Sequence, residues 1–210
     1  DPTGDTPYEN EANSYIAVLK ALKRCFGGKG LPVRLIASAF PEKQLVRLAE
    51  AGATTVGPHL EVWDEKLFEW VCPSKAKYFG RQYWIDSAIT AVKVFGRGNV
   101  CTQWVGGAEM AQPYGFKTID EAVASTLEGT EFFAQHGVSA SVNVLRVQQG
   151  SIFYGQEQAQ PSLEYCVKLS AGISDIRRKY GLGVDLNDYR RCATHPDTDI
   201  SRLDLPDVVV

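Results

Sequence analysis

The chain has 210 residues, of which 44% are hydrophobic and 22% are charged, so it is long enough for one sizeable core or a large part of a barrel. A net charge of −3 provides no basic surface for nucleic acid or an anionic membrane. No apolar run approaches the roughly 20 residues of a membrane span. We therefore expect neither nucleic acid nor a membrane among the partners.

Apolar periodicity and turn residues predict a regular alternation of helices and strands. In chain order the predicted elements are a helix from Pro7 (with Thr6 as its cap) to Gly27, a strand at 33–37, a helix at 41–52, a strand from 54 to 57, a helix after Asp64, a loop at 73–80, a helix at 83–95, a strand at 99–105, a helix at 118–136, a strand at 138–147 and a helix from Pro161 to about Tyr180. Asp64 is expected to cap its helix, and Thr118 with Glu121 fits a capping box.

One helix followed by four strand–helix units is typical of an α/β fold with a parallel sheet. The glycine-rich fingerprint of a dinucleotide fold is missing, which favours a barrel over a doubly wound sheet. We predict a partial parallel (β/α) barrel, TIM-barrel-like, over residues 1–182. Residues 183–210 are predicted to form an irregular polar tail.

The five cysteines are scattered, without a C-x-x-C pair, a zinc-type spacing or a disulfide framework. They are Cys25, Cys72, Cys101, Cys166 and Cys192. This pattern, with no signal-peptide pattern at the start, favours a reducing cytoplasm. The chain opens on Asp1 rather than Met, and we expect the natural protein to begin upstream.

Polar residues gather where the predicted strands end. The strand at 99–105 is apolar and leads into Gly106, Gly107 and Glu109, and the other strands also end in polar residues. In a parallel barrel the carboxyl ends converge on one rim, where ligands bind. The predicted rim residues are Gly4, Asp5, Ser38, His59, Glu61, Gly106, Glu109 and Arg146.

Carboxylates on such a rim suit an amine and a ribose, and glycines admit a flat base, so the set indicates a nucleoside–amino-acid ligand. Each residue alone also has a structural interpretation. Glu109 is suited to capping nearby backbone amides, His59 to packing, and Arg146 to pairing with a rim carboxylate.

These motifs resemble the biotin-synthase-like branch of the radical S-adenosylmethionine enzymes, from the end of that family's second barrel strand onward. The segment 3–7, Thr-Gly-Asp-Thr-Pro, is similar to its Gly-Gly-Glu-Pro turn, with Asp in place of Glu. The segment 102–109 is similar to its Gly-x-Ile-x-Gly-x-x-Glu motif, in which Gly106 and Glu109 match but Thr102 and Trp104 depart. The segment 144–152 is similar to the turn after the sixth strand, with Ser151 in place of Thr.

The resemblance implies a radical S-adenosylmethionine enzyme. The cofactors implied are S-adenosyl-L-methionine and a [4Fe–4S] cluster, which together yield a 5′-deoxyadenosyl radical that abstracts hydrogen from a small-molecule substrate. The partners implied are that substrate and a reductant protein such as ferredoxin or flavodoxin.

The resemblance also assigns roles around the cofactor. Gly4 and Asp5 would lie near its amino group, His59 and Glu61 near its ribose or carboxylate, and Gly106 with Glu109 at the adenine. Ser38 and Arg146 complete this cofactor-binding set at the exits of their strands. Substrate contacts are expected from the loops 78–83 and 111–116.

The family's C-x-x-x-C-x-x-C motif lies after its first strand, a part that this chain does not contain. We therefore predict no metal ligand in the chain itself and expect the cluster in the complete protein. Thiolates are the ligands such a cluster needs. Cys72 and Cys192 are candidates for auxiliary ligands, with buried or idle thiols as the alternative.

Two other functions stay open at this point. One is an aldolase or lyase barrel that uses Lys75 or Lys77 as an amine nucleophile. The other is a cluster-free, nucleoside-binding barrel subunit whose missing strands are supplied by a partner.

Overall fold

The structure is a computed structural model that describes residues 7–155, 158 and 160–182. The helices are α1 (Pro7–Cys25), α2 (Glu42–Ala51), α3 (Glu65–Val71), α4 (Pro73–Tyr78), α5 (Arg81–Phe95), the 3-10 helix η1 (Ala108–Met110), α6 (Ile119–Gln135) and α7 (Leu163–Lys179). The strands are β1 (Arg34–Ala37), β2 (Thr55–Pro58), β3 (Val100–Gly106) and β4 (Val138–Val144). None of the described helices combines the length and the apolar character that a membrane span requires.

The four strands form one parallel sheet in the order β1-β2-β3-β4. β1 pairs with β2, and β3 with β4, along their whole lengths. β2 and β3 pair at Val56 and Val100, and the chain beyond β2 pairs again with β3 through Glu61 and Trp104. Because all neighbours are parallel, the carboxyl ends of the strands lie at one edge of the sheet. This is the predicted α/β fold, a partial TIM-barrel-like barrel of four strand–helix units.

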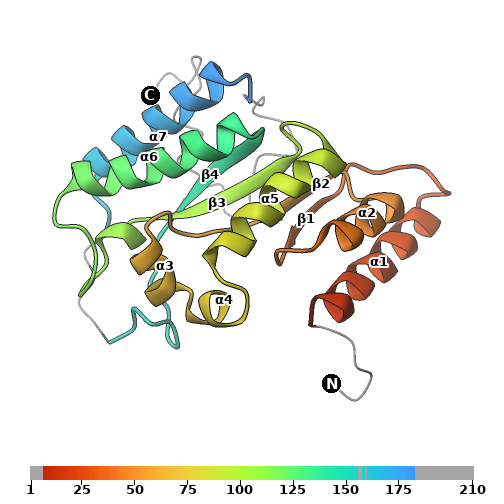
Figure 1. Cartoon of the computed structure of the whole chain (residues 1–210), viewed down its shortest axis with the longest axis horizontal. Helices are drawn as coiled ribbons and strands as arrows, with labels where there is room; N and C mark the ends of the chain where they lie inside the picture. The colour runs from red at the N-terminus through yellow and green to blue at the C-terminus, as the bar shows by residue number, and fades with distance from the viewer. Residues whose placement is uncertain (1–6, 156–157, 159, 183–210) are drawn as a thin grey trace.

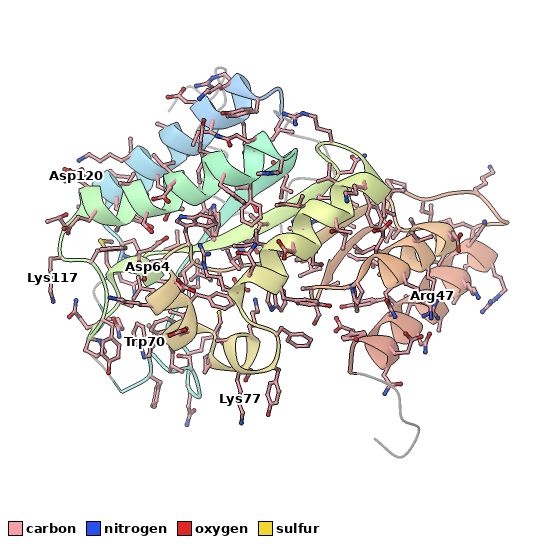
Figure 2. All side chains as sticks on the ribbon, viewed as in Figure 1. Arg47, Asp64, Trp70, Lys77, Lys117 and Asp120 are labelled. Carbon is pink, nitrogen blue, oxygen red and sulfur yellow. The ribbon has the colours of Figure 1, made fainter. Side chains whose placement is uncertain are left out.

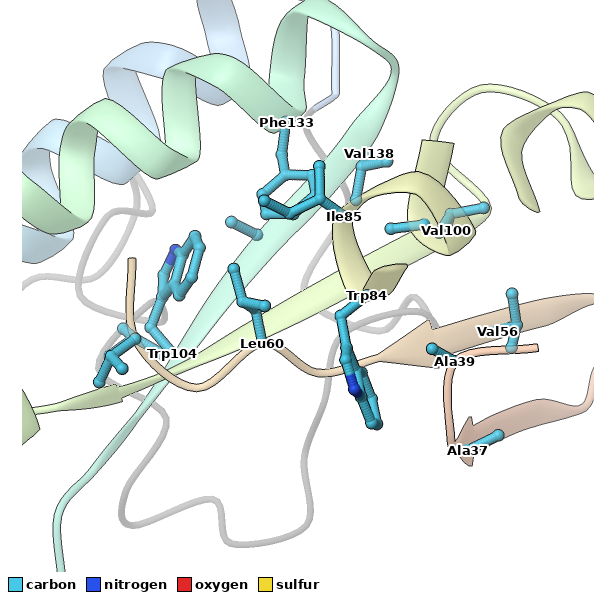
Figure 3. Close-up of a cluster of buried hydrophobic side chains, with 14 of the residues drawn as sticks. Ala37, Ala39, Val56, Leu60, Trp84, Ile85, Val100, Trp104, Phe133 and Val138 are labelled. Carbon is cyan, nitrogen blue, oxygen red and sulfur yellow. The ribbon is translucent and has the colours of Figure 1, made fainter. Parts of the chain in front are cut away.

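The helices lie on one face of the sheet (Figure 1), with α5 against β2 and β3, and α6 and α7 against β4. The hydrophobic core fills the space between the two layers. In Figure 3, Leu60 and Trp104 of the sheet layer meet Ile85 of α5 and Phe133 of α6. Trp104 is fully buried, and its indole N–H donates to Thr130 Oγ1 at 2.9 Å, so its polar atom is satisfied within the core.

Several helix ends lie where the sequence predicts them. Asp64 accepts a hydrogen bond from the Leu67 N–H (2.9 Å) and caps α3. Thr118 and Glu121 form both halves of a capping box at the start of α6. Gly52 ends α2 with φ of 116°, a conformation that favours glycine. The predicted cap Thr6 lies outside the described residues.

Two predicted boundaries are wrong. The segment 73–80 was expected to be a loop, but most of it forms α4. Pro73 is favourable in the first turn of a helix, because the N–H that it lacks would have no partner there. No residue of α4 is buried, so the apolar periodicity that predicts a helix is missing. The last strand ends at Val144 rather than Val147.

Side chains alternate between the two faces of the sheet. Val100 and Trp104 of β3 lie in the core toward the helices, whereas the Cys101 Sγ lies 3.6 Å from Ser141 Oγ on the opposite side. We call this second side the inner face, because it corresponds to the interior of a complete barrel. Its residues on and just after the three strands β2, β3 and β4 include Thr55, Gly57, His59, Cys101, Gln103, Ser139 and Ser141.

Candidate functional site

The parallel sheet brings the predicted rim positions of the described strands to one edge. Ser38 follows β1, His59 and Glu61 follow β2, Gly106 ends β3 with Glu109 just beyond it, and Arg146 follows β4. Gly4 and Asp5 lie outside the described residues. The described candidate residues thus lie at or just beyond the carboxyl edge of the sheet, which is the rim predicted from the order of the elements.

The chain makes an unusual turn at Glu61. Glu61 is, among the described residues other than glycine, the one with a positive φ (76°). Its N–H donates to the Gln103 carbonyl (3.0 Å), and its own carbonyl accepts from the Val105 N–H (2.8 Å). Such a backbone is costly for a residue with a side chain and is found preferentially at functional sites. The turn keeps the pairing with β3 and places the Glu61 side chain at the rim.

Lys75 of α4 holds this turn in place. Its Nζ donates to Glu61 Oε1 (2.8 Å) and to the His59 carbonyl (2.7 Å), and it lies 4.3 Å from the centre of the Trp84 ring. The ammonium is therefore already bound by a carboxylate, a carbonyl and an aromatic face. The exposed Lys77 lies over the ring of Tyr78. Neither lysine has the apolar setting of a Schiff-base nucleophile, and the lysine-dependent aldolase or lyase is not favoured.

His59 lies on the inner face just beyond β2. Only 8% of it is exposed, and its Nε2 has no hydrogen-bond partner. Burial, together with the positive charges of Arg34 and Lys75, lowers the pKa of His59 to about 3. The imidazole is therefore neutral at physiological pH and available as a hydrogen-bonding group rather than as a cation.

Two further buried polar atoms on the inner face resemble His59 Nε2 in lacking a partner. They are Thr55 Oγ1 of β2 and Gln103 Nε2 of β3, whose residues are 2% and 7% exposed. Buried polar atoms are normally hydrogen-bonded, so these atoms are exceptions among the described residues. The sequence analysis missed both residues. The available signal was a polar side chain at alternate positions of strands otherwise rich in small or apolar residues.

Glu109 faces the helices rather than the open rim. Its side chain is fully buried, and one carboxyl oxygen accepts a hydrogen bond from the Thr126 hydroxyl of α6. The other oxygen lies 3.3 Å from the Tyr165 hydroxyl of α7, which in turn accepts from the Gly107 N–H (2.9 Å). Desolvation is the largest effect on this group and raises the pKa of Glu109 to about 7. The group ties the turn after β3 to both helices.

The remaining rim residues have different surroundings. Gly106 packs closely against the helix side, since a Cβ there would lie 2.8 Å from Val142 Cγ2. The Ser38 N–H donates to Glu11 Oε1 of α1 at 3.1 Å. Arg146 is exposed beyond the end of β4. Of the set, Ser38, His59 and Glu61 thus follow neighbouring strands, while Gly106 and Glu109 shape the turn beside them.

The described part of the chain contains no cluster of His, Cys, Asp and Glu side chains suited to a metal ion. Its four cysteines are free thiols: Cys25, Cys72, Cys101 and Cys166. Burial raises the pKa of the Cys72 thiol to about 11, so this candidate auxiliary ligand is protonated at neutral pH. Cys192, the other candidate, lies outside the described residues.

Two hollows open near the start of α3. One, of about 590 Å³, is lined by Trp70 and Tyr114, and the other, of about 610 Å³, by Trp63 and Arg81. Both hollows include Asp64 and Phe116. In Figure 2, Asp64, Trp70 and Lys77 lie at the end of the molecule opposite Arg47. The loop 111–116, predicted to contact substrate, therefore borders open space.

A parallel (β/α) sheet with helices on its outer face and polar residues at its carboxyl edge has the arrangement of a partial barrel, in which ligands bind at that edge. The fold is that of a TIM-barrel-like (β/α) barrel over part of its circumference.

Comparison with known proteins supports the same fold. The structure is similar to methylornithine synthase (PylB), with a TM-score of 0.56 and 14% identity, over 93% of this chain and 61% of that one. The sequence is 24% identical over 138 residues to bacteriochlorophyllide c C-7(1)-hydroxylase of Chlorobaculum limnaeum, covering 66% of this chain and 31% of that protein. No protein-family model matches the chain.

The chain spans about a third of the hydroxylase and about three fifths of the methylornithine synthase chain. The structural similarity shows a shared fold, and membership of the radical S-adenosylmethionine superfamily stays a prediction. The biotin-synthase-like branch stays a prediction.

Proposed function

We propose that this chain is the carboxyl-terminal part of the catalytic barrel of a radical S-adenosylmethionine enzyme that acts on a small molecule. The observation that carries the proposal is the turn at Glu61, where a strained backbone places a carboxylate at the carboxyl edge of a sheet with this fold. Both similar proteins are named for chemistry on small molecules.

The rim suits S-adenosylmethionine in its chemistry. Glu61 offers acceptor oxygens to ribose hydroxyls or to an ammonium group, and His59 offers an unsatisfied ring nitrogen. Ser38 and Arg146 would contribute from the neighbouring strand ends. Gly106 and Glu109 would act through the backbone of the turn after β3, which Glu109 fixes through Thr126 and Tyr165. Gly4 and Asp5 stay assigned to the amino group.

In the complete protein, S-adenosylmethionine with a reduced [4Fe–4S] cluster would supply the radical chemistry needed to abstract hydrogen from the substrate. The described residues do not fit the cluster, because no three thiols lie together. Within the described part we therefore assign only binding, orientation and exclusion of water to this chain. The cluster ligands are expected elsewhere in the complete protein, with ferredoxin or flavodoxin as the reductant.

The complete natural protein, purified without oxygen and with its cluster reconstituted, tests the proposal. Dithionite should produce 5′-deoxyadenosine from S-adenosylmethionine. Glu61→Gln should weaken S-adenosylmethionine binding roughly tenfold or more, because a charged hydrogen-bond acceptor is lost. The exposed Glu65→Gln is the matched control and should leave the affinity unchanged.

The results of these experiments distinguish the proposed function from its alternatives. Unchanged affinity after both Glu61→Ala and Glu109→Ala would show that the cofactor-binding assignment is wrong. A complete protein that binds S-adenosylmethionine but holds no iron would instead be the cluster-free nucleoside-binding subunit.

A further inference from the structure

The hollow of about 590 Å³ beside α3 is lined by aromatic rings and charged groups. It lies between α3 and the loop 111–116, two segments that come after the ends of β2 and β3, and its volume suits a small-molecule ligand. The aromatic and charged residues of its lining are Asp64, Lys66, Glu69, Trp70, Tyr114 and Phe116. None of them belongs to the set assigned to S-adenosylmethionine, so the hollow is a separate feature of the molecule.

The aromatic walls of this hollow are held in place by their surroundings. The rings of Trp70 and Tyr114 meet at 79° with their centroids 5.2 Å apart, and the Phe153 ring packs against Trp70 at 90°. The loop that carries Tyr114 is closed by a hydrogen bond from the Gly115 N–H to the Ala111 carbonyl (2.7 Å). The hollow is therefore formed before any ligand enters, which lowers the cost of ordering side chains on binding.

The charged groups of the lining favour a cation. Asp64 and Glu69 supply two carboxylates against the single ammonium of Lys66, which is exposed. The Asp64 carboxylate is fixed by the hydrogen bond from the Leu67 N–H and keeps further lone pairs for another donor. The second hollow, which shares Asp64 and Phe116 with the first, adds three carboxylates and one guanidinium. The negative charge therefore extends across both hollows.

Two other tryptophans show how aromatic rings are used in this fold. The Arg81 guanidinium lies 4.2 Å from the centre of the Trp63 ring, and the Lys75 ammonium lies 4.3 Å from the centre of the Trp84 ring. Within the described part of the chain, no lysine or arginine lies over the Trp70 ring, although carboxylates line the same hollow. A cation supplied by a ligand would complete the same arrangement at Trp70.

We propose that this hollow binds a small organic cation with an alkylammonium or quaternary ammonium group. The alkyl part would lie against the rings of Trp70 and Tyr114, and the carboxylates of Asp64 and Glu69 would balance the charge. This inference goes beyond the proposed function and does not depend on it, because S-adenosylmethionine is assigned to other residues.

Nuclear magnetic resonance of the complete protein, labelled with ¹⁵N in its tryptophans, tests this site without any turnover. The probes are choline and butylammonium, compared with the alcohol in which carbon replaces the choline nitrogen and with butanol. Choline should shift the indole signal of Trp70 and bind at least about tenfold more tightly than its carbon analogue, which lacks the attraction to the rings and carboxylates. The indole of Trp104, which is fully buried and bonded to Thr130, should keep its signal and thus report an intact fold.

Variants locate the binding. Tyr114→Leu removes one aromatic wall and should weaken choline binding roughly fivefold or more. Tyr78→Leu is the matched control and should have no effect, because both tyrosines are 69% exposed but Tyr78 does not line the hollow. Glu69→Gln should weaken binding about twofold or more, whereas Lys66→Gln should strengthen it by a similar factor. Glu50→Gln, at an exposed position on α2, should leave the affinity unchanged.

Equal binding of choline and its carbon analogue, or an unmoved Trp70 signal with each probe, would overturn the cation site. S-adenosylmethionine is itself an organic cation, and its addition should leave the choline response in place. Displacement of choline by S-adenosylmethionine would overturn a separate site. A choline response in a protein that does not bind S-adenosylmethionine would keep the cation site and remove the proposed function, and binding of the cofactor with no choline response would do the reverse.

Discussion

Glu109 is a carboxyl group that the fold has removed from water. The sequence predicts that Glu109 follows a strand at the rim, and in the structure Glu109 does lie just after β3. Its side chain, however, is held by Thr126 and Tyr165 on the helix side. Its position along the chain was readable from sequence, but the direction of its side chain depends on how α6 and α7 pack against the turn.

The raised pKa of Glu109 predicts a dependence of stability on pH. The folded protein binds this proton up to about pH 7, whereas the unfolded chain releases it near 4.5. Stability should therefore be highest below pH 4.5 as far as this group is concerned, and should fall as the pH rises through 7. The loss is about 3 kcal/mol. Glu109→Gln should remove it.

Urea unfolding at several pH values between 4.5 and 8 measures the difference between Glu109→Gln and the parent protein. Glu128→Gln, an exposed change on α6, is the control and should follow the parent at every pH. Parallel pH profiles for the parent and Glu109→Gln would contradict a buried carboxyl group with a raised pKa.

Lys75 is predicted to be a structural cation and not a nucleophile. Lys75→Met keeps the aliphatic stem but removes the bonds to Glu61 and to the His59 carbonyl. Because the ion pair is partly exposed, the expected loss of stability is about 1 kcal/mol. Lys77→Met should change little, since Lys77 is exposed. Urea unfolding measures both, and borohydride with a carbonyl compound should trap an adduct at neither lysine.

At the scale of the elements, the sequence predicts the features that depend on residues close together in the chain, such as helix caps. The capping box of Thr118 and the cap of Asp64 are confirmed because each depends on residues three positions apart. α4 was missed because no buried residue marks its face. The polar inner face was also missed, because only the pairing of β2 with β3 shows that Thr55 and Gln103 lie on the same face of the sheet.

Two glycines set how closely α6 approaches its neighbours. A Cβ on Gly129 would lie 2.7 Å from the indole of Trp63, and a Cβ on Gly172 would lie 2.5 Å from Leu127 Cδ1. The Trp63 ring is confined by Arg81 and Phe132, whereas Leu127 is a flexible side chain. Gly129→Ala should therefore destabilise by about 1–3 kcal/mol, as overpacking does. Both glycines lie inside helices and gain the same helix propensity on substitution by Ala, so Gly172→Ala should cost less because the flexible Leu127 side chain can move aside.

Thermal or urea unfolding of the two variants gives the comparison directly. A smaller loss for Gly129→Ala than for Gly172→Ala would mean that Trp63 moves more easily than its contacts imply.

At the scale of the whole molecule, the two faces of the sheet differ in what they do. The helix side is a continuous apolar core, and the inner face is polar with unsatisfied atoms. Such a face is tolerated where a ligand forms hydrogen bonds with its polar atoms, and it lowers the stability of the protein when that ligand is absent. The two faces thus differ in composition, with apolar packing against the helices and polar side chains on the inner face.

This division predicts the pattern of hydrogen exchange. β3 is paired on both sides and nearly all of it is buried, so its amides should exchange only when the whole domain opens. α4 has no buried residue, so its amides should exchange through local opening. A difference of about 3 kcal/mol between the free energies that open α4 and β3 would make exchange in α4 roughly 100-fold or more faster than in β3. Because α4 carries Lys75, its opening would also free the Glu61 carboxylate at the rim.

Exchange measured residue by residue, with and without S-adenosylmethionine, should show slower exchange in α4 when the cofactor is bound and little change in β3. Equal protection of α4 and β3 in the free protein would contradict a rigid sheet bordered by a locally opening rim.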